Sequence, residues 1–323
     1  MKRYYAGVDL GGTHMAAGIV NAAGRLLSRA ERPTRAGRPA GEILRDIAEC
    51  AAAAMEQAGI AMKDIAALGI GVPGFADEES GTVSGCNNLG WDELPLRREM
   101  AALTPLPVHV ANDADCAALA ESRIGAAAGA ESCVLITLGT GVGGGIILNG
   151  KIWRGAHQTS GEIGHMVLYP GGLPCNCGRR GCVERYCSAT ALRESVIRNA
   201  SAFPDSAVFR DAERPDAKVI VDAAKAGDPL ACFVFDTFVQ ALATTIDSML
   251  FLLDPEAVLL GGGVSRAGDF LLCAVREKLP RIAMGVERKL PRLGVAALGN
   301  EAGILGAAML GMPEEGNHLS TEA

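Results

Sequence analysis

Short apolar runs of strand length, separated by polar turns, open the chain. Residues 4–10 and 15–21 are two such runs, and a turn at residues 22–24 leads into a third over residues 25–31. Runs of this length, bounded by turn residues, are typical of β-strands. The opening of the chain therefore predicts three consecutive strands.

A helix follows these strands. Apolar residues recur at helical spacing over residues 41–59, and Gly59 marks the end of that helix. Strands are expected over residues 65–72 and 108–111. At the end of the second strand, Asp113 is expected to N-cap a helix that begins at the next residue.

The opening pattern returns farther along the chain. An apolar strand over residues 133–138 is followed by Gly139-Thr140-Gly141 and a second strand through Leu148. Residues 8–13 match residues 136–141 at an offset of about 128, with one-residue slips. This repetition predicts two lobes of similar topology, and its period is too long for a solenoid. Two unrelated strand–glycine–strand hairpins would give a similar pattern by chance.

The second half of the chain is richer in helices. Their helical spacing predicts helices over residues 189–199, 217–226 and 229 to about 253. The remaining elements expected are a strand at 151–154, a strand at 256–260, a helix at 267–279, a strand at 293–297 and a final helix at 302–310.

Length and charge narrow the class of protein. A chain of 323 residues is expected to form two domains. Lys and Arg number 30 against 37 Asp and Glu, so the net charge is -7, which argues against a nucleic-acid or anionic-membrane partner. No apolar run reaches the ~18 residues of a membrane span, and residues 1–5 carry no signal-peptide pattern. A cytoplasmic protein is expected, with a disordered polar tail at 313–323.

Three glycine-rich loops lie at predicted strand ends. Glycine lets backbone N–H groups approach an anion closely, so three such loops are suited to a polyphosphate, although a single one is more simply a tight turn. No P-loop or Rossmann fingerprint is present. Asp9, just before the first loop, is expected to hold Mg²⁺ through water. The residues of the three loops are Gly11, Gly12 and Thr13; Gly139, Thr140 and Gly141; and Gly261, Gly262 and Gly263.

A candidate base and a candidate metal site stand out. Asp113, at a strand end, is suited to accept the proton of an attacking hydroxyl, although it could be only a helix cap; Asp115, inside the helix, is a poorer candidate. One His and three Cys supply the four ligands of a closed, structural zinc site, and Cys187 is then a spare buried thiol. Four unrelated side chains are the alternative. The proposed ligands are His165, Cys175, Cys177 and Cys182.

These motifs together resemble a known family. The residues that carry the resemblance are Asp9–Thr13, Val72-Pro73-Gly74, Asn88–Trp91, Ala111–Ala114, Leu138–Gly145, Gly161–His165, Cys175–Glu184 and Leu260–Val264. In this order they resemble the ROK family of sugar kinases and sugar-responsive repressors, and within it the bacterial ATP-dependent glucokinases. The resemblance covers roughly residues 4–312.

The resemblance implies a fold and a division of the chain. The fold is α/β, an actin-like (ribonuclease H-like), duplicated two-lobed fold with an active-site cleft between the lobes. One lobe would comprise residues 1–120, joined by a C-terminal helix at about 301–312, and the other residues 121–300. Homodimers or homotetramers are expected from relatives.

The resemblance also implies a reaction. ATP would phosphorylate the 6-hydroxyl of a hexose, D-glucose above all, with Asp113 as the base, Mg²⁺ on the phosphates and zinc on the His–Cys site. The ATP phosphates would meet the first two glycine loops, with the nucleotide near the third. The expected sugar contacts are Gly74, Asn88, Asn112, Glu162, His165 and Glu184.

Other substrates and one other function stay open. N-acetylmannosamine, N-acetylglucosamine, allose and fructose are alternative sugars, and His14 and Asn87 depart from residues common in the family. A sugar-sensing repressor is the remote alternative. Such repressors carry a DNA-binding helix-turn-helix before the first glycine loop, and here that loop begins at residue 9, which leaves no room for this motif.

Overall fold

The structure is a computed structural model that describes residues 4–210 and 215–313. Of the predicted tail at 313–323, all but Pro313 lies outside the described residues. Contacts along the chain divide it into two compact units: one runs to Ala117 and resumes at Gly303, and the other spans Ala118–Ala302.

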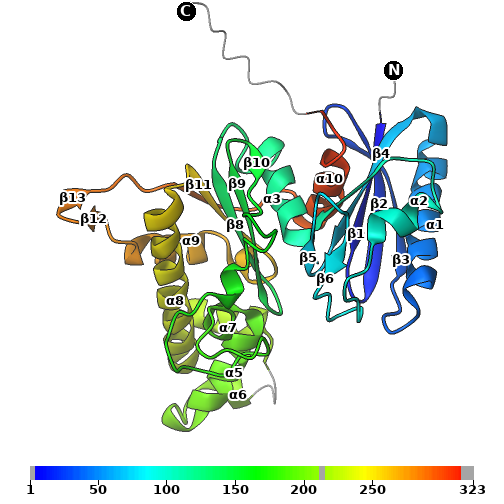
Figure 1. The fold of residues 1–323 in the computed structure, drawn as a ribbon. Coiled ribbons are helices and arrows are strands. Elements are labelled where there is room, and N and C mark those ends of the chain that lie inside the picture. The colour runs from blue at the N-terminus through cyan, green and yellow to red at the C-terminus, as the bar shows by residue number, and fades with distance from the viewer. Residues whose placement is uncertain (1–3, 211–214, 314–323) are drawn as a thin grey trace, which may run out of the picture. The chain divides into compact units, whose positions relative to one another are not determined.

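The first unit is built on a five-stranded sheet of order β3-β2-β1-β4-β7 (Figure 1). β1, β4 and β7 run parallel, whereas β2 and β3 pair antiparallel at one edge. The strands are β1 (Tyr4–Leu10), β2 (His14–Asn21), β3 (Leu26–Pro33), β4 (Ile65–Val72) and β7 (Val108–Asn112). The other elements are α1 (Ala40–Ala58), η1 (Met62–Asp64), β5 (Phe75–Ala76), β6 (Val83–Ser84), α2 (Leu96–Ala101), α3 (Asp113–Arg123), whose last residues belong to the second unit, and α10 (Ala302–Met309).

Glycines allow α10 to lie directly on this sheet. A Cβ on Gly7 or Gly69 would collide with the backbone of α10, and a Cβ on Gly18 would lie 2.8 Å from the Ile304 side chain. α1 packs against β1, β2 and β3 through apolar residues that include Ile43 and Ile47. The sheet is therefore covered by α1 and α10 (Figure 1).

The second unit repeats this plan. Its sheet has the order β10-β9-β8-β11-β14, with β8, β11 and β14 parallel and β9 and β10 antiparallel. The strands are β8 (Cys133–Leu138), β9 (Val142–Leu148), β10 (Lys151–Ile152), β11 (Ala257–Gly261) and β14 (Arg292–Val295). The other elements are η2 (Ile163–His165), α4 (Glu184–Cys187), α5 (Ala189–Asn199), η3 (Ala200–Ala202), α6 (Ala207–Arg210), α7 (Ala217–Lys225), α8 (Pro229–Leu253), η4 (Val264–Ala267), α9 (Asp269–Lys278), β12 (Ile282–Ala283), β13 (Val286–Glu287) and η5 (Gly299–Glu301). The identical strand order confirms the predicted internal repeat.

α8 is the central helix of the second unit. By length and apolar composition it could cross a membrane, but 61% of its most apolar stretch is buried within the unit. Its inward residues, such as Phe238 and Leu242, join the apolar cluster that also contains β8 and β11. Core packing accounts for its apolar composition.

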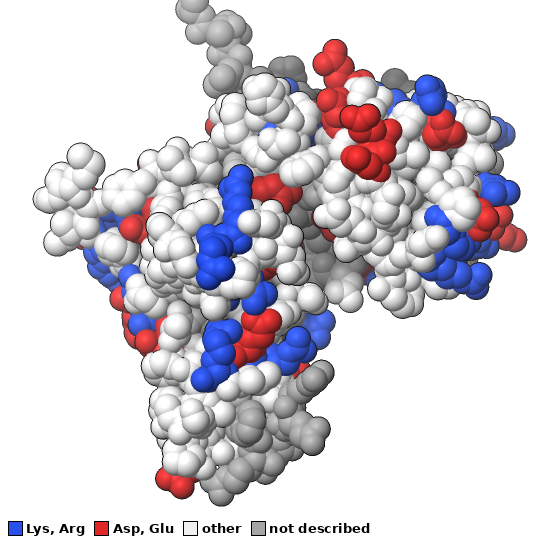
Figure 2. All heavy atoms as spheres, turned by 60° about the horizontal axis from the view of Figure 1, so that its bottom comes forward, with Lys and Arg blue, Asp and Glu red and all other residues white. Residues whose placement is uncertain are grey.

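Charges of both signs occur on the surface. Figure 2 shows small groups of Lys and Arg with Asp and Glu nearby, separated by wide uncharged areas. The expectation that nucleic acid is not a partner stays a prediction.

The structure corrects several predicted boundaries. α3 begins at Asp113, one residue earlier than predicted, so Asp113 is the first helical residue and not the cap. The helix predicted at 267–279 is divided at Gly268, whose φ of 62° separates η4 from α9. β10 ends at Ile152, two residues before the predicted end of that strand.

The close contact between α10 and α3 gives a prediction about stability. A Cβ on Gly306 would collide with the Cys116 carbonyl, so Gly306→Ala should destabilise the protein by ~1–3 kcal/mol through overpacking. Gly41→Ala is the control, because Gly41 lies in α1 with nothing within 4 Å of its Cβ position. That change should stabilise by ~0.5–1 kcal/mol. Thermal unfolding of both variants would measure this, and equal melting temperatures would contradict it.

Candidate functional site

The parallel strands of the first unit bring several predicted site residues to one edge. Asp9 of β1 pairs with Gly71 of β4, and Val72 of β4 pairs with Asn112 of β7. Because all three strands run the same way, their carboxyl ends meet at the same edge of the sheet. Asp9, the turn after β4 and the start of α3 therefore lie close together.

Asn112 locks the turn that precedes α3. Its Nδ2 donates to the Gly74 carbonyl at 2.9 Å. Its Oδ1 accepts from the N–H groups of Ala114 at 2.8 Å and Asp115 at 3.3 Å. Asn112 thus has the capping role that the sequence assigned to Asp113, and it also joins α3 to the loop after β4.

Asp113 has one carboxylate oxygen engaged and one available. Its Oδ1 accepts from the Ala114 N–H at 2.8 Å, and its Oδ2 accepts no hydrogen bond from another of the described residues. Burial raises the pKa of Asp113. A carboxylate with a raised pKa and a free oxygen is suited to general-base chemistry.

A second buried carboxylate stands beside it. Burial first, and then the charge of Asp113, raise the pKa of Asp9 to about 6. Two carboxylates in a poorly hydrated place repel each other when both are ionised, and a nearby cation would relieve that repulsion. The pair therefore suits a site that receives a divalent cation.

Gly303, at the start of α10, was not singled out by sequence reasoning. A Cβ there would lie 2.6 Å from both Cγ and Oδ2 of Asp9. The carboxylate of Asp9 thus rests directly against the α10 backbone. Nothing in the local sequence indicates this, because the contact depends on how α10 packs on the sheet.

The first glycine loop is held by a buried threonine that sequence reasoning also missed. Thr34 donates through Oγ1 to the Gly11 carbonyl at 2.7 Å and through its N–H to the Thr13 carbonyl at 2.8 Å. The backbone N–H groups of Gly12 and Thr13 have no hydrogen-bond partner among the residues that the structure describes. Two free amides at a strand end can bind an anion.

Gly12 also places this loop beside a predicted sugar residue. A Cβ at Gly12 would be 3.2 Å from Cβ of Asn88, which is exposed. In the first unit, the structure therefore gathers Asp9, Gly11–Thr13, Gly74, Asn88, Asn112 and Asp113 around the ends of β1, β4 and β7.

The second glycine loop has the same design. The Gly139 carbonyl accepts from the Ala189 N–H at 2.8 Å, and the Thr140 carbonyl accepts from Thr190 Oγ1 at 2.8 Å. In the described part of the chain, the N–H groups of Thr140 and Gly141 have no hydrogen-bond partner. This loop, too, presents two amides to a ligand.

The third glycine loop lies beside the second. Gly261 of β11 pairs with Thr137 of β8, and Gly262 (φ 79°) lies so near Leu138 that a Cβ would be 2.6 Å from its carbonyl oxygen. The backbone at Gly262 cannot approach so closely with a side chain present. The structure therefore joins 139–141 and 261–263 in one place.

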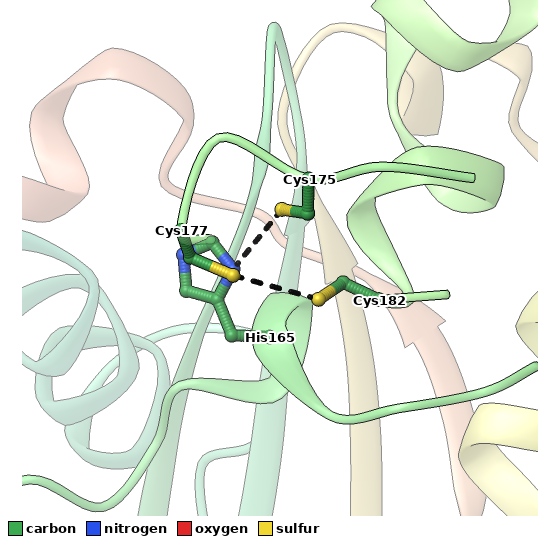
Figure 3. A group of neighbouring side chains, drawn as sticks. All are labelled: His165, Cys175, Cys177 and Cys182. Atoms are coloured by element: carbon green, nitrogen blue, oxygen red, sulfur yellow. Dashed lines mark hydrogen bonds between the residues drawn. The ribbon is translucent and has the colours of Figure 1, made fainter. Parts of the chain in front are cut away.

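Four side chains converge in the predicted metal site (Figure 3). The ligand atoms of His165, Cys175, Cys177 and Cys182 all lie within 4.8 Å of one another. His165 Nδ1 is 3.8 Å from Cys175 Sγ, and Cys177 Sγ is 3.6 Å from Cys182 Sγ. A tetrahedral ion with metal–sulfur distances of ~2.3 Å requires ligand atoms about 3.8 Å apart, so the cluster has the size of a metal site.

The chemistry of the cluster also fits a cation. Burial and the neighbouring Cys177 and Cys175 raise the pKa of the Cys182 thiol to about 12. A thiolate in such a place needs a compensating positive charge, which a divalent ion provides. Gly178 and Gly181 take φ values of 86° and 78°, which let the backbone turn between the ligands as predicted. Cys187 is fully buried, as expected of the spare thiol.

The two predicted carboxylates of the second unit have different surroundings. Glu184 Oε1 is 4.0 Å from Cys175 Sγ, and its Oε2 accepts from the Val142 N–H at 3.1 Å. Glu162 is half-buried and directly precedes η2, where its carbonyl accepts from the His165 N–H at 3.0 Å. Because His165 Nδ1 faces the sulfurs, its Nε2 is left for another partner.

The buried Asp9 carboxylate predicts a pH-dependent stability. An unfolded chain ionises this group near its ordinary pKa, whereas the folded protein ionises it near pH 6, so its burial lowers stability as pH rises through that interval. Asp9→Asn should therefore raise the free energy of unfolding at pH 7.5 by up to about 3 kcal/mol, with little gain near pH 4. The exposed Asp64→Asn should change neither value; denaturant titrations at both pH values test this.

Comparisons with known proteins identify the family of this chain. The model of the ROK family matches residues 5–313. A glucokinase from Halalkalibacterium halodurans is 37% identical over 322 residues, which cover 97% of this chain and 96% of that protein. An N-acetyl-D-glucosamine kinase from Yersinia pseudotuberculosis is 32% identical over 323 residues, covering 96% of this chain and 100% of that protein.

A solved structure shows the same fold. The ROK family glucokinase of Streptomyces griseus, in complex with glucose and AMPPNP, superposes with a TM-score of 0.79 at 37% identity, covering 95% of this chain and 98% of that one. The predicted actin-like, duplicated α/β fold is thereby confirmed. A family match over nearly the whole chain and a shared fold lead to one conclusion: this chain belongs to the ROK family.

Proposed function

We propose that this protein is a sugar kinase that transfers the γ-phosphoryl group of ATP to the 6-hydroxyl of D-glucose. The observation that carries the proposal is the position of Asp113, a partly buried carboxylate with a raised pKa and a free oxygen, at the strand edge where Asp9 and the first glycine loop also lie. The glucokinase relatives, 37% identical over nearly the whole chain, support glucose as the substrate.

Asp113 is the proposed general base. The free Oδ2 accepts the proton of the sugar 6-hydroxyl while the hydroxyl oxygen attacks the γ-phosphorus. The bond between the γ-phosphorus and the bridging oxygen of ADP breaks. The hydrogen bond from Ala114 keeps the other carboxylate oxygen fixed. Asn112, held by three hydrogen bonds, sets the position of the turn that carries Asp113.

The phosphates are the proposed ligands of the free backbone amides. Gly12 and Thr13 in one loop and Thr140 and Gly141 in the other supply N–H groups that offset the charge of the transferring group. Asp9 would hold Mg²⁺ through water, and that ion would supply positive charge to the phosphate oxygens. The nucleotide would lie near the glycines at 261–263.

Six residues are the proposed sugar contacts. Gly74, Asn88 and Asn112 belong to the first unit, and Glu162, His165 and Glu184 to the second. Carboxylate, amide and imidazole groups are suitable partners for sugar hydroxyls. The Nε2 atom of His165 is the proposed sugar contact, since Nδ1 faces the cysteines.

Zinc is the proposed ion of the His–Cys cluster. One imidazole and three thiols whose ligand atoms lie within 4.8 Å of one another form a complete ligand set, which is typical of structural zinc. Bound there, the ion would fix the tautomer and orientation of His165.

The setting of the enzyme is also part of the proposal. Both substrates, ATP and a free sugar, are met in the cytoplasm, and a homodimer or homotetramer is expected there. An N-acetylhexosamine kinase is the second candidate function, because one such relative is 32% identical over 96% of this chain.

A coupled ATP assay with a panel of sugars tests the proposal. We expect the highest kcat/KM with D-glucose, ahead of N-acetylglucosamine, N-acetylmannosamine, allose and fructose. Asp113→Asn should lower kcat by at least ~10²-fold because the base is lost, while the Kd for glucose stays within a few fold. Equal turnover by the variant would overturn the base assignment, and preference for another sugar would replace glucose.

Metal analysis tests the ion. Freshly purified protein should contain about one zinc per chain. Cys177→Ser should lose most of that zinc and bind glucose more weakly, because His165 is no longer oriented by the ion. The exposed Cys273→Ser is the matched control and should keep both properties. Protein that is folded, active and free of zinc would refute the assignment.

A further inference from the structure

One short segment of the second unit joins the metal cluster to the second glycine loop. Segment 182–190 begins at Cys182, a proposed zinc ligand, passes through α4 and ends in the first turn of α5. Ser188 caps α5 by accepting from the Ala191 N–H at 3.0 Å. The capped first turn is thereby held in a defined position.

The α5 end of the segment donates hydrogen bonds to two consecutive carbonyls of the loop. The Ala189 N–H donates to Gly139, and the Thr190 hydroxyl donates to Thr140. Both carbonyls are thus turned toward α5. A peptide N–H points opposite to its C=O, so the free amides of Thr140 and Gly141 are turned the other way, toward a ligand.

The α4 end of the segment contacts the same loop through Glu184. Glu184 Oε2 accepts from the Val142 N–H, and a Cβ on Gly141 would collide with that carboxylate. The other oxygen, Oε1, lies 4.0 Å from the Cys175 thiol. One side chain therefore touches both the metal cluster and the glycine loop.

We propose that Thr190 and Glu184 are positioning residues for the nucleotide-phosphate loop, and that through them segment 182–190 joins the metal cluster to ATP binding. The inference rests on the proposed function, because it takes residues 139–141 as phosphate ligands. Thr190 is the residue to substitute in the test, since it has no proposed contact with sugar or metal. Among the residues that the structure describes, its hydroxyl hydrogen-bonds to the Thr140 carbonyl and to no other group.

Titration with a non-hydrolysable ATP analogue, without sugar, is the first measurement. Thr190→Val removes the hydroxyl at nearly constant volume and should raise the Kd for the analogue about fivefold, the loss of one hydrogen bond. Thr190→Ala should do the same, and Thr190→Ser, which keeps the donor, should bind like wild type. Thr244→Val removes an equivalent hydroxyl from the exposed face of α8 and should have no effect.

The second measurement separates positioning from general damage. In Thr190→Val, KM for ATP should rise about fivefold while the Kd for glucose and the zinc content stay at wild-type values. Unchanged analogue binding in both hydroxyl-less variants would overturn the inference. A parallel loss of glucose and nucleotide binding, or no rescue by Thr190→Ser, would also overturn it. Wild-type protein that neither binds the analogue nor phosphorylates sugar would instead refute the proposed function.

Discussion

Parallel pairing of the central strands is the constraint on which the site depends. In each unit three strands run in the same direction, so every loop that follows them emerges at one edge of the sheet. Residues as distant in sequence as Asp9 and Asp113 meet for this reason. Parallel strands require long crossover connections, and here those connections carry α1 in the first unit and α8 and α9 in the second, whereas α10 follows the last strand.

Burial of two carboxylates at that edge of the sheet changes their acidity. The pKa values of Asp9 and Asp113 are raised, chiefly because water is excluded from their surroundings. An acid that holds its proton more tightly is a better base once ionised, and its repulsion toward a like-charged neighbour favours cation binding. The same burial that makes the pair useful therefore lowers the stability of the protein near neutral pH.

Duplication extends to the way in which each glycine loop is held. Thr34 in the first unit and Thr190 in the second each donate a hydroxyl hydrogen bond to a loop carbonyl. In both loops, two backbone N–H groups have no hydrogen-bond partner among the described residues. In the second unit, the holding residue belongs to the segment that begins at Cys182, so the His–Cys cluster and the second glycine loop share one support.

The sequence by itself determined most elements, the repeat and the members of the His–Cys cluster, because these depend on local patterns. α5 and α8 have their predicted bounds, and the spacing of Cys175, Cys177 and Cys182 identified the cluster. Only the tertiary structure decided which side chains hold the loops. Gly303 packs against Asp9, and Thr34 donates a hydrogen bond to Gly11. Each contact joins distant segments of the chain, and neither Gly303 nor Thr34 lies in a motif. The N-cap of α3 is likewise Asn112 and not Asp113. Both residue types are good N-caps, and the hydrogen bond between Asn112 and the Gly74 carbonyl fixes the turn in which Asn112 takes this role.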